Sequence, residues 1–168
     1  FAAEENDGRP VGVAAYIAAS IGGWPLAVSL LGSSEDLAAK LQQARVIKDM
    51  LHQPQEALPI FQEVFNANEG SLAAALGLAR VAHLGEDPSI AAEAHSRLAH
   101  MMAPGPYAVA HALWAGGLYA TNNVFKEREH FQLALGYQPT SVKAYEGALS
   151  ANVRLNDGDA LIELVESY

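Results

Sequence analysis

The sequence predicts an all-α fold in which short helices pair as antiparallel hairpins and the hairpins stack, an α-solenoid. Three observations support this fold class. No segment shows the apolar–polar alternation of a strand, and Val and Ile are sparse. Ala and Leu, both strong helix formers, dominate the chain. Helix-breaking residues recur at even intervals and leave segments of about 12–16 residues, a normal helix length.

The length, the cysteine content and the net charge of the chain exclude several classes of site and partner. The 168 residues suffice for one domain or for part of a repeat array. The absence of cysteine excludes disulfides, thiolate metal sites and a cysteine nucleophile. With 19 acidic and 10 basic residues, the formal net charge is −9. Phosphate binding needs clustered Lys and Arg, and Glu127 interrupts the one tight basic pair, Lys126 with Arg128. Nucleic acid is therefore not an expected partner.

The beginning of the chain is polar and then strongly apolar. Residues 1–10 are predicted to be a polar leader, and the missing initial methionine indicates processing or trimming. Residues 11–33 are apolar, and a run this long without charge is typical of a membrane span. Gly22-Gly23-Trp24-Pro25 breaks the run, because proline removes a backbone donor and glycine weakens a helix. We expect a buried pair of helices at 11–21 and 24–31, a candidate degenerate leading repeat, and do not favour membrane contact.

Eight further helices are predicted over residues 34–168. Ser33 or Ser34 is expected to cap the first of them, ahead of Glu35 and Asp36 in its N-terminal turn. The remaining boundaries fall at Asn-, Gly- and Pro-rich turns. The predicted helices cover 35–51, 54–67, 71–84, 88–102, 107–121, 124–136, 140–154 and 158–167.

Large and small residues recur at fixed spacing along these helices. The clearest set is Trp114-Ala115, Leu118, Glu127, Phe131, Ala134 and Pro139. This set resembles the tetratricopeptide repeat, a 34-residue helix–turn–helix unit. Matching units give four repeats, at 38–71, 72–107, 108–141 and 142–168. The resemblance implies a superhelix whose first helices line a concave face and whose second helices form the convex face.

The resemblance also assigns packing roles. Small residues such as Ala115 and Ala134 are expected to let helices approach, while Trp114, Phe61 and Phe131 fill the space between layers. Residues 126–129 are interpreted as a solvated helix face with local ion pairs. The last segment, 160–168, is more apolar than an end-capping helix should be. We therefore expect further residues in the native chain, or a partner or second copy, to cover it.

No catalytic or metal-binding pattern stands out. The sequence lacks a phosphate loop, a dinucleotide fingerprint, a His-Glu-x-x-His motif and a nucleophile elbow. None of the six histidines pairs with another at helical spacing, so no metal site is predicted. Paired carboxylates such as Glu35-Asp36 lie where acidic residues cap helices or are solvated. We predict no enzymatic activity, no cofactor and no metal.

The family register places candidate partner-binding residues on the concave face. They are Gln42, Asp49, Leu76, Arg80, His83, Tyr119, Glu146 and Val153. Arg80 is the only basic residue in this set. The Lys/Arg/Asn clamp with which some family members hold a C-terminal carboxylate is therefore not expected. The mixed, partly apolar lining favours a helix or an extended protein segment.

The leading functional hypothesis is a non-enzymatic interaction module, a scaffold, adaptor or chaperone, that binds a partner protein segment in its concave groove. The role as an adaptor is implied by the family resemblance. One alternative is a structural subunit of a larger, membrane-associated assembly, docked through residues 11–32 or the C-terminal face. Another is an accessory domain of an enzyme whose catalytic part lies elsewhere. Homo-oligomerisation stays open, as does localisation to the cytoplasm, the periplasm or a membrane-associated assembly.

Overall fold

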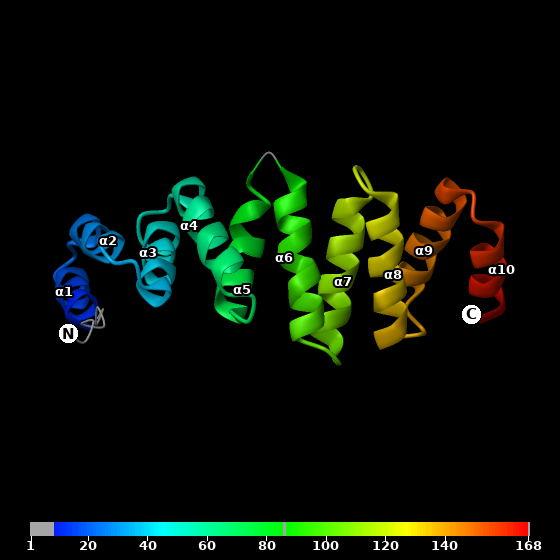
Figure 1. Cartoon of the computed structure of the whole chain (residues 1–168), viewed down its shortest axis with the longest axis horizontal. Helices are drawn as coiled ribbons and strands as arrows, with labels where there is room; N and C mark the ends of the chain where they lie inside the picture. The colour runs from blue at the N-terminus through cyan, green and yellow to red at the C-terminus, as the bar shows by residue number, and fades with distance from the viewer. Residues whose placement is uncertain (1–8, 86, 168) are drawn as a thin grey trace, which may run out of the picture. The chain divides into compact units, whose positions relative to one another are not determined.

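The computed structural model describes residues 9–85 and 87–167, and all regular secondary structure in these ranges is α-helical. The bounds differ from the predicted ones by two residues at most, and the all-α hairpin fold is confirmed (Figure 1). The described helices are α1 (Arg9–Ser20), α2 (Trp24–Gly32), α3 (Leu37–Asp49), α4 (Pro54–Ala67), α5 (Leu72–Ala82), α6 (Pro88–Met101), α7 (Pro106–Tyr119), α8 (Val124–Tyr137), α9 (Val142–Leu155) and α10 (Gly158–Ser167).

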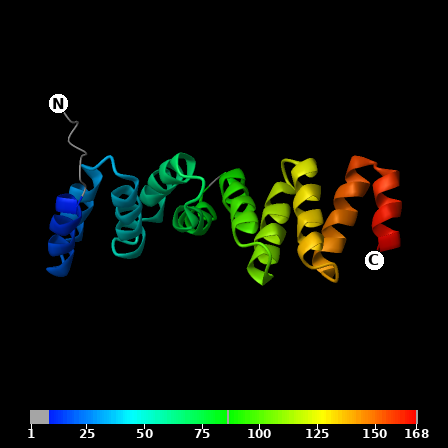
Figure 2. The ribbon, with the colours of Figure 1, turned by 60° about the horizontal axis from the view of Figure 1, so that its bottom comes forward.

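The chain forms two compact units, which divide between Leu84 and Gly85. The first unit holds α1–α5 and the second α6–α10. Within each unit every helix packs against the helices next to it in sequence, as both views of the ribbon show (Figures 1 and 2). In addition α3 contacts α5, and α7 contacts α9. First helices of successive hairpins therefore lie side by side, which is the arrangement of stacked helical hairpins.

Capping residues and prolines set the helix starts. Proline occupies the first turn of α2, α4, α6 and α7, where its missing N–H costs nothing. The side chains of Ser71 and Ser141 accept hydrogen bonds from the N–H groups of Ala74 and Ala144, which caps α5 and α9. The predicted cap of α3 needs correction. Asp36 caps this helix by accepting from Ala39 N–H at 3.1 Å.

The apolar residues near the start of the chain form a helical hairpin. α1 and α2 bury Ala15, Ala18, Ala27 and Leu31 against α3. Within residues 9–85 and 87–167, no helix combines the length and the apolar character needed to cross a membrane. Residues 9 and 10, which we predicted to belong to the polar leader, are part of α1. Residues 1–8 of the predicted leader lie outside the described residues.

In the second unit the core is built largely of alanine. Ala112, Ala134 and Ala144 are fully buried where α7, α8 and α9 meet. Their small side chains let helix backbones approach closely, which was predicted for Ala134. Trp114 does not fill the interior, contrary to the prediction, since 57% of it is exposed. Ala115 takes the buried position instead, which rotates the Trp114 ring to the surface of α7.

The charged run 126–129 is not simply a solvated face. Glu127 is only 3% exposed and forms an ion pair with Arg154 of α9. Arg128 forms another ion pair, to Asp157 at 2.8 Å. A buried carboxylate needs such a cation, because desolvation without a partner is costly. These ion pairs join α8 to α9 and to the turn between α9 and α10.

The last described helix leaves apolar side chains uncovered. On α10, Leu164 is buried, whereas Ile162 and Val165 are exposed. The prediction that something covers this face stays a prediction, and Tyr168, which belonged to it, lies outside the described residues.

Candidate protein-binding pockets

Two phenylalanines occupy equivalent places in the two units. Phe61 of α4 and Phe131 of α8 lie 70 residues apart, the length of two repeats. The next first helix offers each ring a glycine, Gly77 on α5 and Gly147 on α9. A Cβ atom at Gly147 would lie 2.5 Å from the Phe131 ring, and one at Gly77 would likewise collide with Phe61. Each ring is therefore wedged against a helix backbone, at the floor of a pocket between two first helices.

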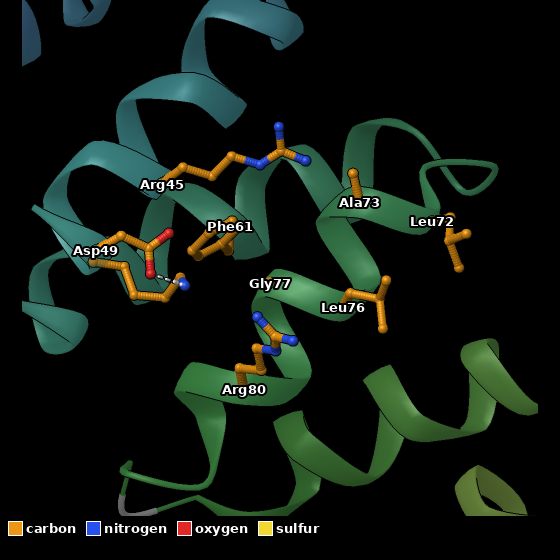
Figure 3. Close-up of a pocket in the computed structure, with 9 residues that line it drawn as sticks. Arg45, Asp49, Phe61, Leu72, Ala73, Leu76, Gly77 and Arg80 are labelled. Atoms are coloured by element: carbon orange, nitrogen blue, oxygen red, sulfur yellow. Dashed lines mark hydrogen bonds and ion pairs between the residues drawn. The ribbon is translucent and has the colours of Figure 1, made fainter. Parts of the chain in front are cut away.

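The first such pocket lies between α3 and α5 and measures about 350 Å³. In Figure 3 the side chains of Arg45 and Arg80 approach it from opposite sides, with Phe61 and Gly77 between them. We name it the α3–α5 pocket, and its lining is Arg45, Lys48, Asp49, Phe61, Leu72, Ala73, Leu76, Gly77 and Arg80.

Positive charge dominates the α3–α5 pocket. Lys48 is neutralised by an ion pair with Asp49. Arg45 and Arg80 are exposed, and neither forms a hydrogen bond or an ion pair with any residue that the structure describes. The pocket thus presents two free guanidinium groups above an aromatic floor.

The second pocket lies between α7 and α9 and is larger, about 770 Å³. We name it the α7–α9 pocket, and its lining is Ala110, Leu113, Trp114, Gly117, Leu118, Phe131, Lys143, Glu146 and Gly147. Most of this lining is apolar. The exposed Trp114 ring borders it, while Lys143 and Glu146 supply one charge of each sign.

His95 stacks on the Trp114 ring, and His111 in turn contacts His95. The Trp114 ring lies on His95 of α6, with centroids 5.8 Å apart and planes inclined by 15°. The Nδ1 atoms of His95 and His111 lie 2.8 Å apart, so one of them donates and the other accepts. Burial lowers the pKa of His111 below its ordinary 6.5, which favours the neutral ring.

A serine–histidine contact elsewhere in the second unit is structural. His130 Nδ1 donates to the carbonyl oxygen of Lys126 at 2.7 Å, so its Nε2 accepts from the hydroxyl of Ser96, also at 2.7 Å. His130 is buried, and Ser96 is partly buried. The contact joins α6 to α8.

A third pocket, of about 460 Å³, lies between α1 and α3. Ala27 stands 34 residues before Phe61 and lines this pocket at the corresponding place, so the aromatic floor is missing. The pocket is lined mostly by apolar residues of α1 and α2, with Asp36 and Gln42 as polar members.

The predicted site residues fall in different places. Gln42 lines the α1–α3 pocket, while Asp49, Leu76 and Arg80 come together in the α3–α5 pocket. Glu146 lines the α7–α9 pocket.

The other three predicted site residues are not brought together. His83 and Val153 are exposed, at the end of α5 and on α9. Tyr119 does not border an open groove, contrary to the prediction, because it is only 4% exposed and donates a hydrogen bond to Glu93 at 3.1 Å. Burial raises the pKa of its hydroxyl, and the neighbouring Glu93 carboxylate raises it further. Tyr119 is a packing residue between α6 and α7.

Sequence reasoning missed several lining residues, among them Arg45, Trp114 and Gly117. The 70-residue offset that relates Phe61 and Gly77 to Phe131 and Gly147 was visible in the sequence and would have identified both floors. Among the described residues, no three His, Asp or Glu side chains gather at metal-binding distance.

Comparison with known proteins supports the architecture. No family model matches the sequence, and no curated protein matches it. The chain is similar to MamA (41-end) from Desulfovibrio magneticus RS-1, with 16% identity, a TM-score of 0.54, and coverage of 98% of this chain and 94% of that one. Another MamA crystal structure shows 13% identity, a TM-score of 0.55, and coverage of 95% and 88%.

A tetratricopeptide repeat protein from Parabacteroides merdae is also similar, with 16% identity and a TM-score of 0.51. The alignment covers 93% of this chain and 63% of that one. Together with the helix order, these similarities show that the chain has a helical-repeat fold of the tetratricopeptide type.

Proposed function

We propose that the chain is a non-catalytic interaction module that binds an apolar segment of a partner protein in the α7–α9 pocket. The observation that carries this proposal is the exposed Trp114 ring beside a pocket of about 770 Å³. Ligand-binding pockets in proteins typically measure about 300–1,000 Å³. An exposed tryptophan leaves much apolar surface in water, and a partner that covers it gains the corresponding hydrophobic free energy.

The rest of the lining supports an extended or helical peptide as the ligand. Leu113, Leu118 and Phe131 offer apolar contacts, so the partner needs at least one bulky apolar residue. Lys143 and Glu146 lie one turn apart on α9 and can orient the polar groups around that anchor. His95 restrains the Trp114 ring, which lowers the entropy lost on binding.

Gly117 provides a direct test, because it lines the pocket and a Cβ atom there would meet open space. Gly117→Gln should fill the pocket without disturbing the fold, and a residue other than glycine favours the helix by roughly 0.5–1 kcal/mol. We expect peptides selected from a random dodecamer display library on the unsubstituted protein to contain a bulky apolar residue. They should bind Gly117→Gln at least about tenfold more weakly, a loss of roughly 1.4 kcal/mol.

Gly136→Gln is the matched control. Gly136 lies on α8, has open space around it, and does not line the pocket. Its substitution should leave peptide affinity unchanged while raising helix stability to a similar extent. Equal binding to both variants, or failure of the library to yield any binder, would argue against the α7–α9 pocket as the binding site.

One observation favours the alternative of a structural subunit. Val13, Ile17 and Ile21 recur every four residues, the first two on α1 and the last just after it, and all are exposed. Such an apolar stripe is typical of a surface that another protein covers. If this stripe docks the chain into a larger assembly, the unsubstituted chain should sediment with that assembly and the Ile17→Lys variant should not. Peptide binding should be the same in both.

A further inference from the structure

Some lysine and arginine side chains of this chain form ion pairs with carboxylates, and others do not. Lys40, Lys48, Lys126, Arg128 and Arg154 all form ion pairs with carboxylates. Among the described side chains, the cations without any hydrogen bond or ion pair are Arg45, Arg80 and Lys143. All three line a pocket between first helices. In a chain with 19 acidic residues, free cations gathered there point to an external anion.

Two of these free cations share the α3–α5 pocket. Arg45 comes from α3 and Arg80 from α5, and they flank the floor made by Phe61 and Gly77 (Figure 3). Leu76 adds apolar surface beside that floor. A guanidinium group presents a planar fork of donors that matches a carboxylate. The pocket thus combines an apolar centre with carboxylate-binding groups on either side.

We propose that the α3–α5 pocket binds an acidic segment of a partner protein, one in which Asp or Glu residues flank an apolar residue. This inference rests on the proposed function and specifies the chemistry of the partner. The apolar side chain lies on Phe61, and the flanking carboxylates accept hydrogen bonds from Arg45 and Arg80. Because the chain itself carries a net charge of −9, these two groups provide a local attraction for an acidic partner that the rest of the molecule repels.

The preference for acidic residues is specific to this pocket. Seventy residues further on, Leu76 and Arg80 are replaced by Glu146 and Ser150. An acidic segment in the α7–α9 pocket would therefore meet a carboxylate where Leu76 stands in the first unit. The floors of the two pockets are alike, each made of a phenylalanine and a glycine, but the charged residues around them differ. We therefore expect the two pockets to select different side chains.

A carboxylate fits better than a phosphate group. Arg45 and Arg80 lie on opposite sides of the Phe61 floor, so two singly charged carboxylates that flank an apolar residue match them better than one doubly charged phosphate group does. A phosphorylated segment is thus the competing occupant that the experiment has to exclude.

The test uses the full chain and the probe acetyl-Glu-Glu-Leu-Glu-Glu-amide, which has no free terminus. Its titration should shift the side-chain Nε resonances of Arg45 and Arg80 in nitrogen-15 NMR spectra. The counterpart with Gln in place of every Glu should bind at least about tenfold more weakly, because charge-assisted hydrogen bonds are lost. Arg45→Gln and Arg80→Gln should each weaken binding about three- to tenfold, the range for partly solvated pairs.

Lys143→Gln is the charge-matched control and should not change the affinity for the acidic probe. Equal binding of the Gln peptide, or a loss in Lys143→Gln as large as in the arginine variants, would overturn the proposal. So would tighter binding of a phosphoserine peptide, or binding that requires a free C-terminus. Gly117→Gln should leave this probe unaffected, which separates failure here from failure of the α7–α9 pocket.

Discussion

Asn152 is the least well satisfied polar side chain in the described part of the second unit. It is 0% exposed, and neither its amide nitrogen nor its amide oxygen has a hydrogen-bond partner among the described residues. A buried amide without a partner costs free energy, because it has given up its hydrogen bonds to water.

Asn152→Leu is therefore expected to raise the free energy of unfolding by about 1 kcal/mol, since it removes the unsatisfied amide and adds apolar contact. Urea denaturation monitored by circular dichroism measures this change. The exposed Asn122→Leu is the control and should change stability by less than about 0.5 kcal/mol. A clear loss of stability in Asn152→Leu would mean that the amide makes a stabilising bond.

His111 links stability to pH. Its pKa lies below 6.5 in the folded chain, so the unfolded chain binds more protons between that lowered pKa and about pH 6.5. The contribution of the neutral ring is present above pH 6.5 and is lost as the pH falls through the folded-state pKa.

We expect the midpoint temperature of unfolding to fall between pH 7.5 and pH 5, and to fall less in His111→Gln. His100→Gln, at an exposed position on α6, serves as the control and should keep the full pH dependence. If His111→Gln and the unsubstituted chain lose the same stability on acidification, burial of His111 is not the cause.

At the scale of the helix, a phenylalanine wedged on a glycine sets how closely a second helix packs against the next first helix. Gly147→Ala places a methyl group against the Phe131 ring and should destabilise the second unit by about 1–3 kcal/mol. Gly117→Ala, which meets open space, should instead stabilise it by up to about 1 kcal/mol. Thermal unfolding distinguishes the two.

The companion variant Gly147→Ala with Phe131→Leu tests the mechanism. A smaller side chain on α8 should relieve part of the clash, so the double variant should be more stable than the sum of the two single changes predicts. Strict additivity would show that the glycine acts through helix propensity alone.

Helix boundaries followed from sequence because the signals are local. Prolines such as Pro54 and Pro88 start helices, and capping residues such as Ser71 and Ser141 fix others, so no tertiary information is needed. The side that each helix turns toward a neighbour was harder to predict. One residue rotates a helical position by about 100°, so Ala115 can be buried as expected while its neighbour Trp114, expected to fill the interior, is exposed.

The candidate site was only partly predictable for a geometric reason. Each first helix borders two pockets with two different faces. On α3, Gln42 and Val46 line the α1–α3 pocket, whereas Arg45 and Lys48 line the α3–α5 pocket. The predicted positions on α3 took Gln42 from the first face and Asp49 from the second, and they missed Arg45, which lies one turn before Asp49.

At the scale of the whole molecule, the repeat provides two pockets with a common floor and distinct linings. The first unit offers arginines beside Phe61, and the second offers Trp114 beside Phe131. Repeat units that keep their packing residues can vary the exposed ones freely, because each contacts only its neighbours. A partner that engages both pockets would carry an acidic segment and an apolar segment, and linked segments gain affinity through effective concentration.

The central claim is that the exposed Trp114 marks a surface that protein segments cover, and its own fluorescence tests this most directly. The chain has two tryptophans, so Trp24→Phe leaves Trp114 as the only one. Addition of a peptide selected from the dodecamer library should shift its emission to shorter wavelength and reduce quenching by acrylamide, with saturation at the peptide's own dissociation constant. Unchanged emission and unchanged quenching at saturating peptide would contradict the account.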